Sequence, residues 1–362
     1  MIEFKLPSLG ADMDQGTLLE WRVKPGDPVK RGDVVALVDT TKAAVDVEIW
    51  EAGTVFEILV QPGEKIPVGT VLATLLSPGE SSPTTAAPAI ASVSRRQMSP
   101  AARRRAAELK IDLDGLAGTG PGGAVTLADV EKFAQAAAPQ DRGRQMRAAI
   151  AAAMSRSKRE IPHYYLAETV PLDRAGAWLS NQNLGRPVTG RILMAALFVK
   201  AVARAVRDYP EMNGYYRDGG FEPATAAHVG VAISLRGGGL VAPALRDAGD
   251  KSLAQVMHEL SDLVARARAG SLRSSEVSDP SITVTNLGDQ GVESVFGVIY
   301  PPQVALVGFG RVSERPWAVD GAVKPIPAVT ASLAADHRVS DGHRGAAFLA
   351  GIRDLLMRPE DL

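Results

Sequence analysis

Five histidines occur in the chain, and His337 lies in a setting suited to proton transfer. It stands between an apolar run that ends at Ala335 and a polar turn, in the segment ADHRVSDGH, which His343 closes. Because an imidazole has an ordinary pKa of about 6.5, a histidine at such a boundary is a candidate general base at neutral pH. The other histidines fall in or beside expected strands and helices, which favours structural roles: His163, His228 and His258.

The composition excludes several other chemistries. The chain has no cysteine, so disulfides, thiolate zinc sites and a cysteine nucleophile are ruled out, and any thiol must come with a cofactor or substrate. No second, suitably spaced histidine cluster joins the carboxylates near His337, which disfavours a metal site. A Gly-rich loop at residues 118–123 lacks the Gly-Lys-Ser/Thr and the preceding strand of a phosphate-binding loop.

A second candidate residue, Lys42, lies between two copies of an internal repeat. Identical or similar residues from Gly16 to Val34 recur 37 positions later, from Gly53 to Val71. Each copy alternates apolar and polar residues between glycine turns, which predicts short antiparallel strands and a pseudo-symmetric β-sandwich. The link at residues 39–43 then falls at a hairpin tip. Exposure alone does not single out Lys42, because lysine is nearly always exposed. Its position at the symmetry point of the repeat does.

Composition also bounds the domain organisation. With 362 residues, 46% apolar content and a net charge of −1, the chain is expected to hold two or three soluble domains and to bind no nucleic acid or other general polyanion. Residues 77–94 are mostly Pro, Ser, Thr and Ala, which predicts a mobile linker that reaches on the order of 55 Å. A shorter break spans residues 135–143.

No membrane segment is expected. The most apolar stretch, residues 192–206, is interrupted by Lys200 and Arg204, and the N-terminus lacks a basic segment followed by an apolar core. These features predict a cytoplasmic protein.

Between the two linkers, residues 98–134 predict a small helical domain. Ser99 followed by Pro100 is a good start for one helix, and Thr126 with Asp129 three residues later opens a second. Such a small domain has a marginal core. Its basic stretch at residues 95–110 is either a solvated helix face or a docking surface.

The last 220 residues or so are long enough for one enzyme domain. Residues 251–269 show helical periodicity and end at Gly270. Apolar, strand-like runs occur at residues 228–235, 281–287, 303–312 and 328–334. This interleaving predicts an α+β domain with a mixed sheet covered by helices.

The repeat resembles a lipoyl domain of the acyltransferase (E2) components of 2-oxo acid dehydrogenase complexes. The resemblance rests on GTLLEWRVKPGDPVKRGDVVALVDTTKAAVDVE and implies that Lys42 carries lipoate in amide linkage. Biotin carriers share the architecture but usually flank their lysine with methionines, whereas Thr41 and Ala43 stand here. Relatives often place aspartate at the position of Thr41, where it contributes to recognition by the decarboxylase (E1).

Residues 98–134 resemble the peripheral subunit-binding domain of the same family, which docks E1 or the dihydrolipoamide dehydrogenase (E3). The resemblance makes Arg103 and Arg104 candidates for contacts with an acidic partner surface. Two departures from the family pattern are Ala124, in place of an arginine, and Arg105, in place of a leucine.

The C-terminal region resembles the catalytic domain of the family, whose fold is similar to chloramphenicol acetyltransferase. DHRVSDG fits the catalytic signature, and TNLG, PHYYL and YPPQVALVGFG fit further blocks. The resemblance implies that His337 is the general base, that the Thr285 hydroxyl stabilises the oxyanion and that Asp341 fixes local structure near the base through an arginine. It further implies coenzyme A as substrate, trimers with the active site between subunits, and a larger core.

The expected domains are therefore a lipoyl sandwich at residues 1–77, a linker at 78–96, a subunit-binding domain at 97–134, a linker at 135–143 and a catalytic domain at 144–362. We expect an acyltransferase, with acetyl favoured on commonness alone over succinyl or branched-chain groups. The alternatives are a non-catalytic core or E3-binding subunit, against which the intact His337, Asp341 and Thr285 argue, and a pure lipoyl or biotinyl carrier.

Overall fold

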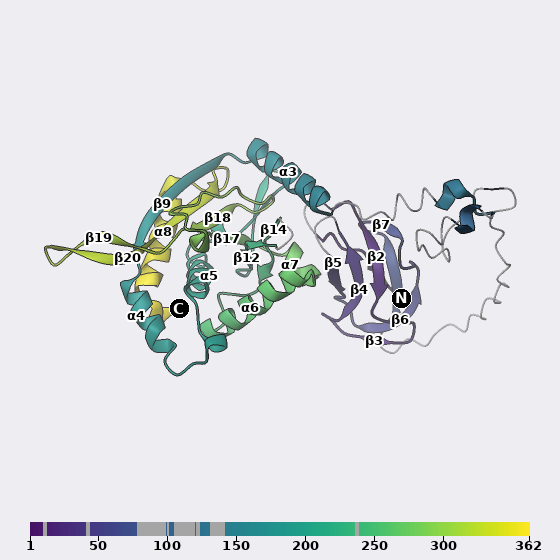
Figure 1. Cartoon of the computed structure of the whole chain (residues 1–362), viewed down its shortest axis with the longest axis horizontal. Coiled ribbons are helices and arrows are strands. Elements are labelled where there is room, and N and C mark those ends of the chain that lie inside the picture. The colour runs from purple at the N-terminus through teal and green to yellow at the C-terminus, as the bar shows by residue number, and fades with distance from the viewer. Residues whose placement is uncertain are drawn as a thin grey trace. The chain divides into compact units, whose positions relative to one another are not determined.

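The computed structural model describes residues 1–9, 13–40, 44–77, 99, 101–104, 120, 124–130, 142–235 and 239–362. The chain forms two compact units, one made of residues 1–80 and 146–362 and the other of residues 81–145. Within the first unit we call residues 1–77 the N-terminal sandwich and residues 146–362 the C-terminal domain (Figure 1).

The N-terminal sandwich consists of two antiparallel sheets, with strand orders β1-β8-β6-β3 and β5-β4-β2-β7. Its strands are β1 (Ile2–Lys5), β2 (Gln15–Trp21), β3 (Pro28–Val29), β4 (Val34–Asp39), β5 (Ala44–Glu48), β6 (Gly53–Ile58), β7 (Lys65–Pro67) and β8 (Val71–Leu76). Both repeat copies contribute to both sheets, because β3 pairs with β6 and β7 pairs with β2. The predicted sandwich is confirmed.

The predicted pseudo-symmetry is visible in the turn glycines. Gly26 and Gly63 have φ values of 97° and 94°, a region that favours glycine. The amide of Gly26 donates to the carbonyl of Val55, and that of Gly63 donates to the carbonyl of Leu18, both at 2.7 Å. The two halves therefore exchange equivalent hydrogen bonds and hold one another in place.

The C-terminal domain is built on a mixed sheet with the order β15-β12-β17-β18-β20-β19, and β9 pairs with β20. The strands are β9 (His163–Pro171), β12 (Val229–Val231), β15 (Ala244–Leu245), β17 (Ile282–Asn286), β18 (Ala305–Phe309), β19 (Ser313–Val319) and β20 (Ala322–Asp336). Strands β12, β17 and β18 run parallel, whereas β20 is antiparallel to β18 and β9. The predicted α+β class is confirmed.

Short strands and helices complete the domain. They are β10 (Gly214–Arg217), β11 (Gly220–Pro223), β13 (Ile233–Ser234), β14 (Leu240–Val241), β16 (Leu272–Arg273), α3 (Arg142–Glu160), α4 (Asp173–Gln182), α5 (Met194–Ala205), α6 (Leu253–Ala269), α7 (Ser274–Ser278) and α8 (Gly342–Met357). Helices α5 and α8 pack on the sheet and on each other, and α6 packs against α5. Phe198 of α5 stacks on Phe309 of β18 with ring centroids 4.2 Å apart, in the centre of this core.

Gly308 of β18 and Gly310, just after this strand, allow an irregular segment to cross the sheet. A Cβ at Gly308 would lie 2.6 Å from the carbonyl oxygen of Val295, and one at Gly310 would lie 2.0 Å from that of Glu293. Only glycine permits this approach. The Ser157 hydroxyl donates to the Ile299 carbonyl at 2.7 Å and ties the segment to α3.

The predicted helix at residues 251–269 is α6. Ser252 and Gln255 form a capping box at its start, and Gly270 ends it in the left-handed region, with a φ of 73°. The predicted strand at residues 228–235 is divided into β12 and β13, and the run from residue 328 is only the second half of β20. The first half of β20 forms a hairpin with β19 that the pattern did not predict.

In the second unit, both predicted helix starts are confirmed. The amide of Ala102 donates to the hydroxyl of Ser99 at 3.1 Å. Thr126 and Asp129 cap each other, because the Thr126 amide donates to the Asp129 carboxylate at 2.9 Å and the Asp129 amide donates to the Thr126 hydroxyl at 3.3 Å.

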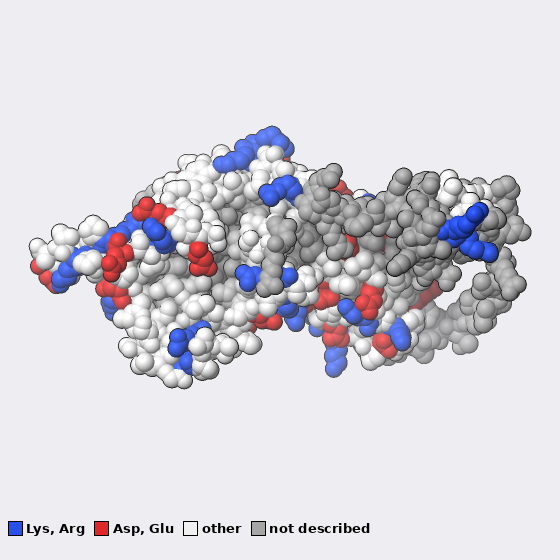
Figure 2. Space-filling view, viewed as in Figure 1, with Lys and Arg blue, Asp and Glu red and all other residues white. Residues whose placement is uncertain are grey.

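Charged side chains of both signs are interspersed on the face of the C-terminal domain that Figure 2 shows, in keeping with the net charge of −1. None of the helices in the described parts of the chain has the length and hydropathy needed to cross a bilayer.

Candidate active site

His337 lies in a tight turn between β20 and α8. Its backbone amide donates to the carbonyl of Pro162 at 3.0 Å, and the amide of Ser340 closes the turn by donating to the carbonyl of Asp336 at 3.1 Å. The residue itself is exposed. The turn is thus fixed to the start of β9, while the imidazole is open to a substrate.

Two neighbours of His337 form the base of the turn. The Asp336 carboxylate is fully buried and accepts three hydrogen bonds from the Arg338 guanidinium, at 2.9, 3.1 and 2.6 Å. The same guanidinium lies over the ring of Tyr216 of β10, 3.9 Å from its centroid. Arginine stacked and paired in this way is held on two sides, so the backbone on both sides of His337 is fixed.

Tyr164 contacts the imidazole from β9. Its ring meets that of His337 edge-on, with centroids 5.2 Å apart, and its hydroxyl hydrogen-bonds with the Ser340 hydroxyl at 2.8 Å. Burial raises the pKa of Tyr164, so the phenol stays protonated. Gly345 of α8 makes room for this ring, because a Cβ there would lie 2.8 Å from two ring-system atoms of Tyr164.

Asp341 caps α8. Its side chain accepts a hydrogen bond from the backbone amide of Arg344 at 2.9 Å. This hydrogen bond lowers the pKa of the Asp341 carboxyl. The hydrogen-bond donor to the Asp341 carboxylate is thus a backbone amide rather than a guanidinium. The guanidinium next to the base belongs to Arg338 and pairs with Asp336, a role that sequence reasoning missed although both residues lie in the DHR motif.

Thr285 lies near the end of β17 and is partly exposed. Its strand partner on β18 is Gly308, which in turn pairs with Ser332 of β20. Ser332 precedes His337 by five residues. At about 3.3 Å per residue along a strand and about 4.8 Å between strands, Thr285 and His337 are about 19 Å apart within one chain. A single chain therefore does not bring the two residues together.

His163 fixes the segment that crosses the sheet. Its Nε2 accepts a hydrogen bond from the amide of Ile299 at 3.1 Å, so its Nδ1 carries the proton and donates to the carbonyl of Ile161 at 2.9 Å. Burial lowers the pKa of His163. These contacts agree with the structural role expected for His163.

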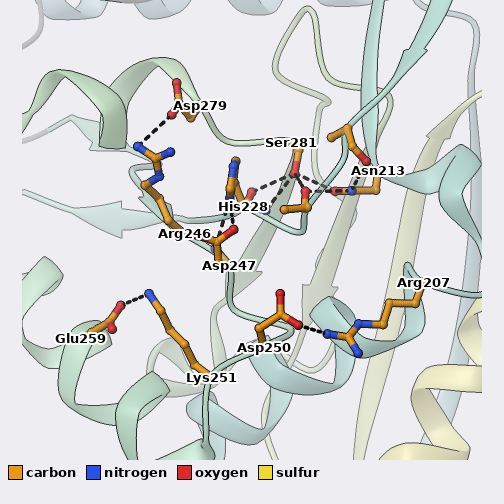
Figure 3. Close-up of polar contacts among 12 residues, drawn as sticks. Arg207, Asn213, His228, Arg246, Asp247, Asp250, Lys251, Glu259, Asp279 and Ser281 are labelled. Carbon is orange, nitrogen blue, oxygen red and sulfur yellow. Dashed lines mark hydrogen bonds and ion pairs between the residues drawn. The ribbon is translucent and has the colours of Figure 1, made fainter. Parts of the chain in front are cut away.

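A serine, a histidine and an aspartate also meet around β12, but not as a catalytic triad (Figure 3). The Ser281 hydroxyl donates to Asn213 at 2.6 Å and accepts from the backbone amide of His228 at 3.0 Å, not from its ring. The ring accepts from the amide of Asp247 through Nδ1 at 3.1 Å. The cluster joins loops to the sheet. Within the residues that the structure describes, no group of histidines and carboxylates could hold a metal ion.

Two further sets of predicted residues lie outside the C-terminal domain. Asp39 and Ala44 are paired at the ends of β4 and β5, so the residues between them join the two strands of a hairpin. Lys42 itself lies outside the described residues. Arg103 and Arg104 are exposed in the second unit.

Three family comparisons cover most of the chain. Residues 139–362 match the 2-oxoacid dehydrogenases acyltransferase (catalytic domain) family. Residues 2–75 match the family described as biotin-requiring enzyme, and residues 96–131 match the e3 binding domain. The chain therefore belongs to the 2-oxoacid dehydrogenase acyltransferases.

Curated relatives align over almost the full length. The chain is 30% identical to the dihydrolipoyllysine-residue acetyltransferase component of the pyruvate dehydrogenase complex of Zymomonas mobilis, with 99% of this chain and 98% of the relative covered. It is 31% identical to the lipoamide acyltransferase component of the branched-chain alpha-keto acid dehydrogenase complex of Pseudomonas aeruginosa, with the same coverage.

Solved structures resemble the C-terminal domain. A probable dihydrolipoamide acetyltransferase from Listeria monocytogenes is 28% identical, with a TM-score of 0.56 over 59% of this chain and 91% of that chain. A structure of the Azotobacter vinelandii enzyme is 25% identical, with a TM-score of 0.57 over 60% and 90%. That study concerns the role of a serine, a histidine and an asparagine in catalysis. The spacings of these three residues equal those of Thr285, His337 and Asp341 in this chain.

Proposed function

We propose that this protein transfers an acyl group between a dihydrolipoyl thiol on Lys42 and coenzyme A, as the E2 subunit of a 2-oxo acid dehydrogenase complex. Membership of the acyltransferase family supports the reaction class. The observation that carries the proposal is His337, whose imidazole is exposed on a turn that Asp336 and Arg338 hold rigid. We favour acetyl as the acyl group, because the first two curated relatives are acetyltransferase components.

His337 acts as the general base. The thiol of the substrate coenzyme A is expected to have a pKa of about 8.5, like that of cysteine, so it is mostly protonated at neutral pH. Neutral His337 takes this proton as the sulfur attacks the acyl thioester. The bond between the acyl carbon and the dihydrolipoyl sulfur then breaks, and the imidazolium returns the proton to that leaving sulfur. Assistance of this kind typically raises a rate by about 10²- to 10⁴-fold.

Thr285 stabilises the developing charge. Attack on a thioester gives a tetrahedral oxyanion, which needs a hydrogen-bond donor aimed at it. The hydroxyl of Thr285 is such a donor, and it lies at the position that corresponds to the serine studied in the Azotobacter vinelandii enzyme. Asp341 contributes indirectly, by capping α8 beside the base.

The working unit is an oligomer, which we propose is a trimer within a larger core. Since Thr285 and His337 of one chain are about 19 Å apart, they can serve one thioester only if the hydroxyl and the base come from different subunits. A structure of the cubic core of a pyruvate dehydrogenase complex, 25% identical to this chain, supports the larger assembly.

Lys42 is the attachment point for lipoate. The pairing of Asp39 with Ala44 makes the connection that contains Lys42 the end of a hairpin, which suits a lysine held away from the core. When bound, lipoate supplies the dithiol that carries the acyl group.

We further propose that the domain boundaries given above hold, that the protein is cytoplasmic and that it acts away from membranes. Arg103 and Arg104 would contact acidic surfaces of E3 or E1. Their exposure and the match of residues 96–131 to the e3 binding domain support this assignment.

The reaction is tested with purified protein, free dihydrolipoamide and three acyl donors, namely acetyl-, succinyl- and isobutyryl-coenzyme A. We expect the highest kcat/KM with acetyl-coenzyme A and lipoate at Lys42 by mass spectrometry. A preference for isobutyryl-coenzyme A would identify a branched-chain enzyme, the alternative favoured by the relative from Pseudomonas aeruginosa. No transfer from any donor would refute the proposal.

A further inference from the structure

The first unit contains an intramolecular strand pairing that the reaction itself does not need. Strand β5 is the outer strand of its sheet in the N-terminal sandwich, and β16 of the C-terminal domain pairs with it in parallel. Val45 is opposite Leu272, and Asp46 is opposite Arg273. Edge strands carry unpaired backbone groups, so pairing of this kind is a common mode of protein recognition. Opposite charges at paired positions favour this register.

Glu48 makes a second contact next to the paired strands. Its side chain is only 5% exposed, and its carboxylate accepts hydrogen bonds from the Ser275 amide at 3.2 Å and the Ser274 hydroxyl at 3.4 Å. The Glu48 amide in turn donates to the Ser274 hydroxyl at 3.1 Å. Burying a carboxylate without hydrogen-bond partners is unfavourable. The contacts with Ser274 and Ser275 therefore favour this placement of Glu48 over others.

Apolar and aromatic contacts surround this pairing. Val277 of α7 packs against the hydrophobic clusters of both the N-terminal sandwich and the C-terminal domain. Trp50 lies under two guanidinium groups, that of Arg31 from the sandwich at 5.3 Å and that of Arg246 from the C-terminal domain at 5.6 Å. Backbone, buried polar and cation–π contacts thus converge on one face.

A cavity lies beside this contact. Thr40, two positions before Lys42, lines a cavity whose other walls include Tyr215 and Pro302 of the C-terminal domain. The Pro302 carbonyl accepts a hydrogen bond from the amide of Tyr216, whose ring lies against the guanidinium of Arg338. Strand β10 thus lies between this cavity, which Tyr215 lines, and the guanidinium of Arg338, which lies over Tyr216.

We propose that β16 and α7 form a docking site for the chain's own N-terminal sandwich, which recognises the backbone of β5 and the carboxylate of Glu48. The proposal rests on the proposed function, because docking here brings the carrier hairpin to the acyltransferase site. The pairing covers only two residues of each strand, and no ion pair of Glu48 is seen among the described residues. Such a contact is weak enough to release the sandwich for visits to other sites.

Disulfide trapping tests the docking directly, because the chain has no cysteine of its own. Asp46→Cys with Arg273→Cys places two thiols at paired positions, within the Cα separation that a disulfide spans. In full-length protein under mild oxidation, we expect an intramolecular disulfide that forms at least about tenfold faster than in a control with Glu57→Cys and Arg273→Cys. Glu57 is exposed on β6 of the other sheet. Equal rates would mean random collision and would overturn the proposal, as would covalent dimers in place of the intramolecular product.

A charge reversal tests the recognition residue. Glu48→Lys should slow trapping about tenfold and reduce acylation of the lipoyl group on Lys42 to a similar degree, whereas Glu57→Lys should change neither. Transfer to free dihydrolipoamide should stay unchanged in both variants, because Glu48 and Glu57 take no part in the chemistry. Unchanged trapping in Glu48→Lys would overturn the docking site. Absence of transfer to free dihydrolipoamide in the unmodified protein would instead refute the proposed function.

Discussion

Arg338 donates to both oxygens of the buried Asp336 carboxylate, and the residue between them in sequence is the exposed His337. A buried carboxylate and its arginine partner thus flank the exposed His337 in sequence. Because the backbone around His337 is fixed, the imidazole can be positioned near the reacting thiol without a hydrogen bond from its own side chain.

Replacing Arg338 should therefore affect both stability and rate. Arg338→Met leaves the Asp336 carboxylate buried without a cation, and breaking such a pair lowers the free energy of unfolding by about 3 kcal/mol. We expect kcat to fall about tenfold with little change in KM, since only the position of the base is disturbed. Urea unfolding and steady-state kinetics measure the two effects.

The control for this variant is Arg353→Met, because Arg353 pairs with the partly exposed carboxylates of Glu168 and Asp354. An exposed pair contributes at most about 1 kcal/mol. Equal losses for the Arg338 and Arg353 variants would show that the ion pair below His337 has no special role.

Gly345→Ala should move Tyr164 away from the imidazole. The added Cβ would lie 2.8 Å from the Tyr164 ring, so the ring must shift, whereas Gly342 in the same helix has nothing within 4 Å of such a Cβ. We expect a drop in kcat of about tenfold for Gly345→Ala and none for Gly342→Ala, with circular dichroism unchanged in both. An unaffected kcat in Gly345→Ala would remove Tyr164 from the set of positioning residues.

Mixed oligomers test whether the hydroxyl and the base come from different subunits. Thr285→Ala alone should lower kcat by about 10²- to 10³-fold, and Thr285→Ser should retain most activity. When His337→Ala and Thr285→Ala subunits are co-expressed in equal amounts, about one quarter of the subunit interfaces regain both groups. Activity near that fraction of the unmodified level is expected, and no recovery would place both residues in one subunit's site.

Stability should decrease as the pH falls below neutrality. Burial lowers the pKa of both His163 and His228, so these rings stay neutral in the folded state while the unfolded chain takes up protons near pH 6.5. The unfolded state then binds more protons, and stability is lost as the pH falls from about 6.5 toward the lower folded-state values. The melting temperature of His228→Gln should depend less steeply on pH between about 7.5 and 5.5 than that of the unmodified protein. An identical slope would contradict a neutral, buried His228.

Parts of this arrangement follow from local sequence and parts do not. The repeat predicted the sandwich because each copy carries its own turn glycines, and Gly26 and Gly63 do adopt equivalent conformations. The helix starts at Ser99 and Thr126 were predicted from capping chemistry, and helix α6 was predicted from its periodicity.

The sequence pattern could not predict which distant strands pair with one another. The distance between Thr285 and His337 depends on the registers of three strands, and a short periodic segment carries no information on its partners. The long strand β20 was recognised only in its buried half, because its first half is exposed against β19 and lacks an apolar run. The sequence alone does not distinguish Glu48 from a surface glutamate. Only its contacts with Ser274 and Ser275 reveal its role.

The central claim is that His337 removes the proton from the thiol of coenzyme A. The most direct measurement is acyl transfer from acetyl-coenzyme A to free dihydrolipoamide by His337→Ala, with intact assembly verified by sedimentation. We predict a fall in kcat of about 10²- to 10⁴-fold. A loss of less than about tenfold would contradict it.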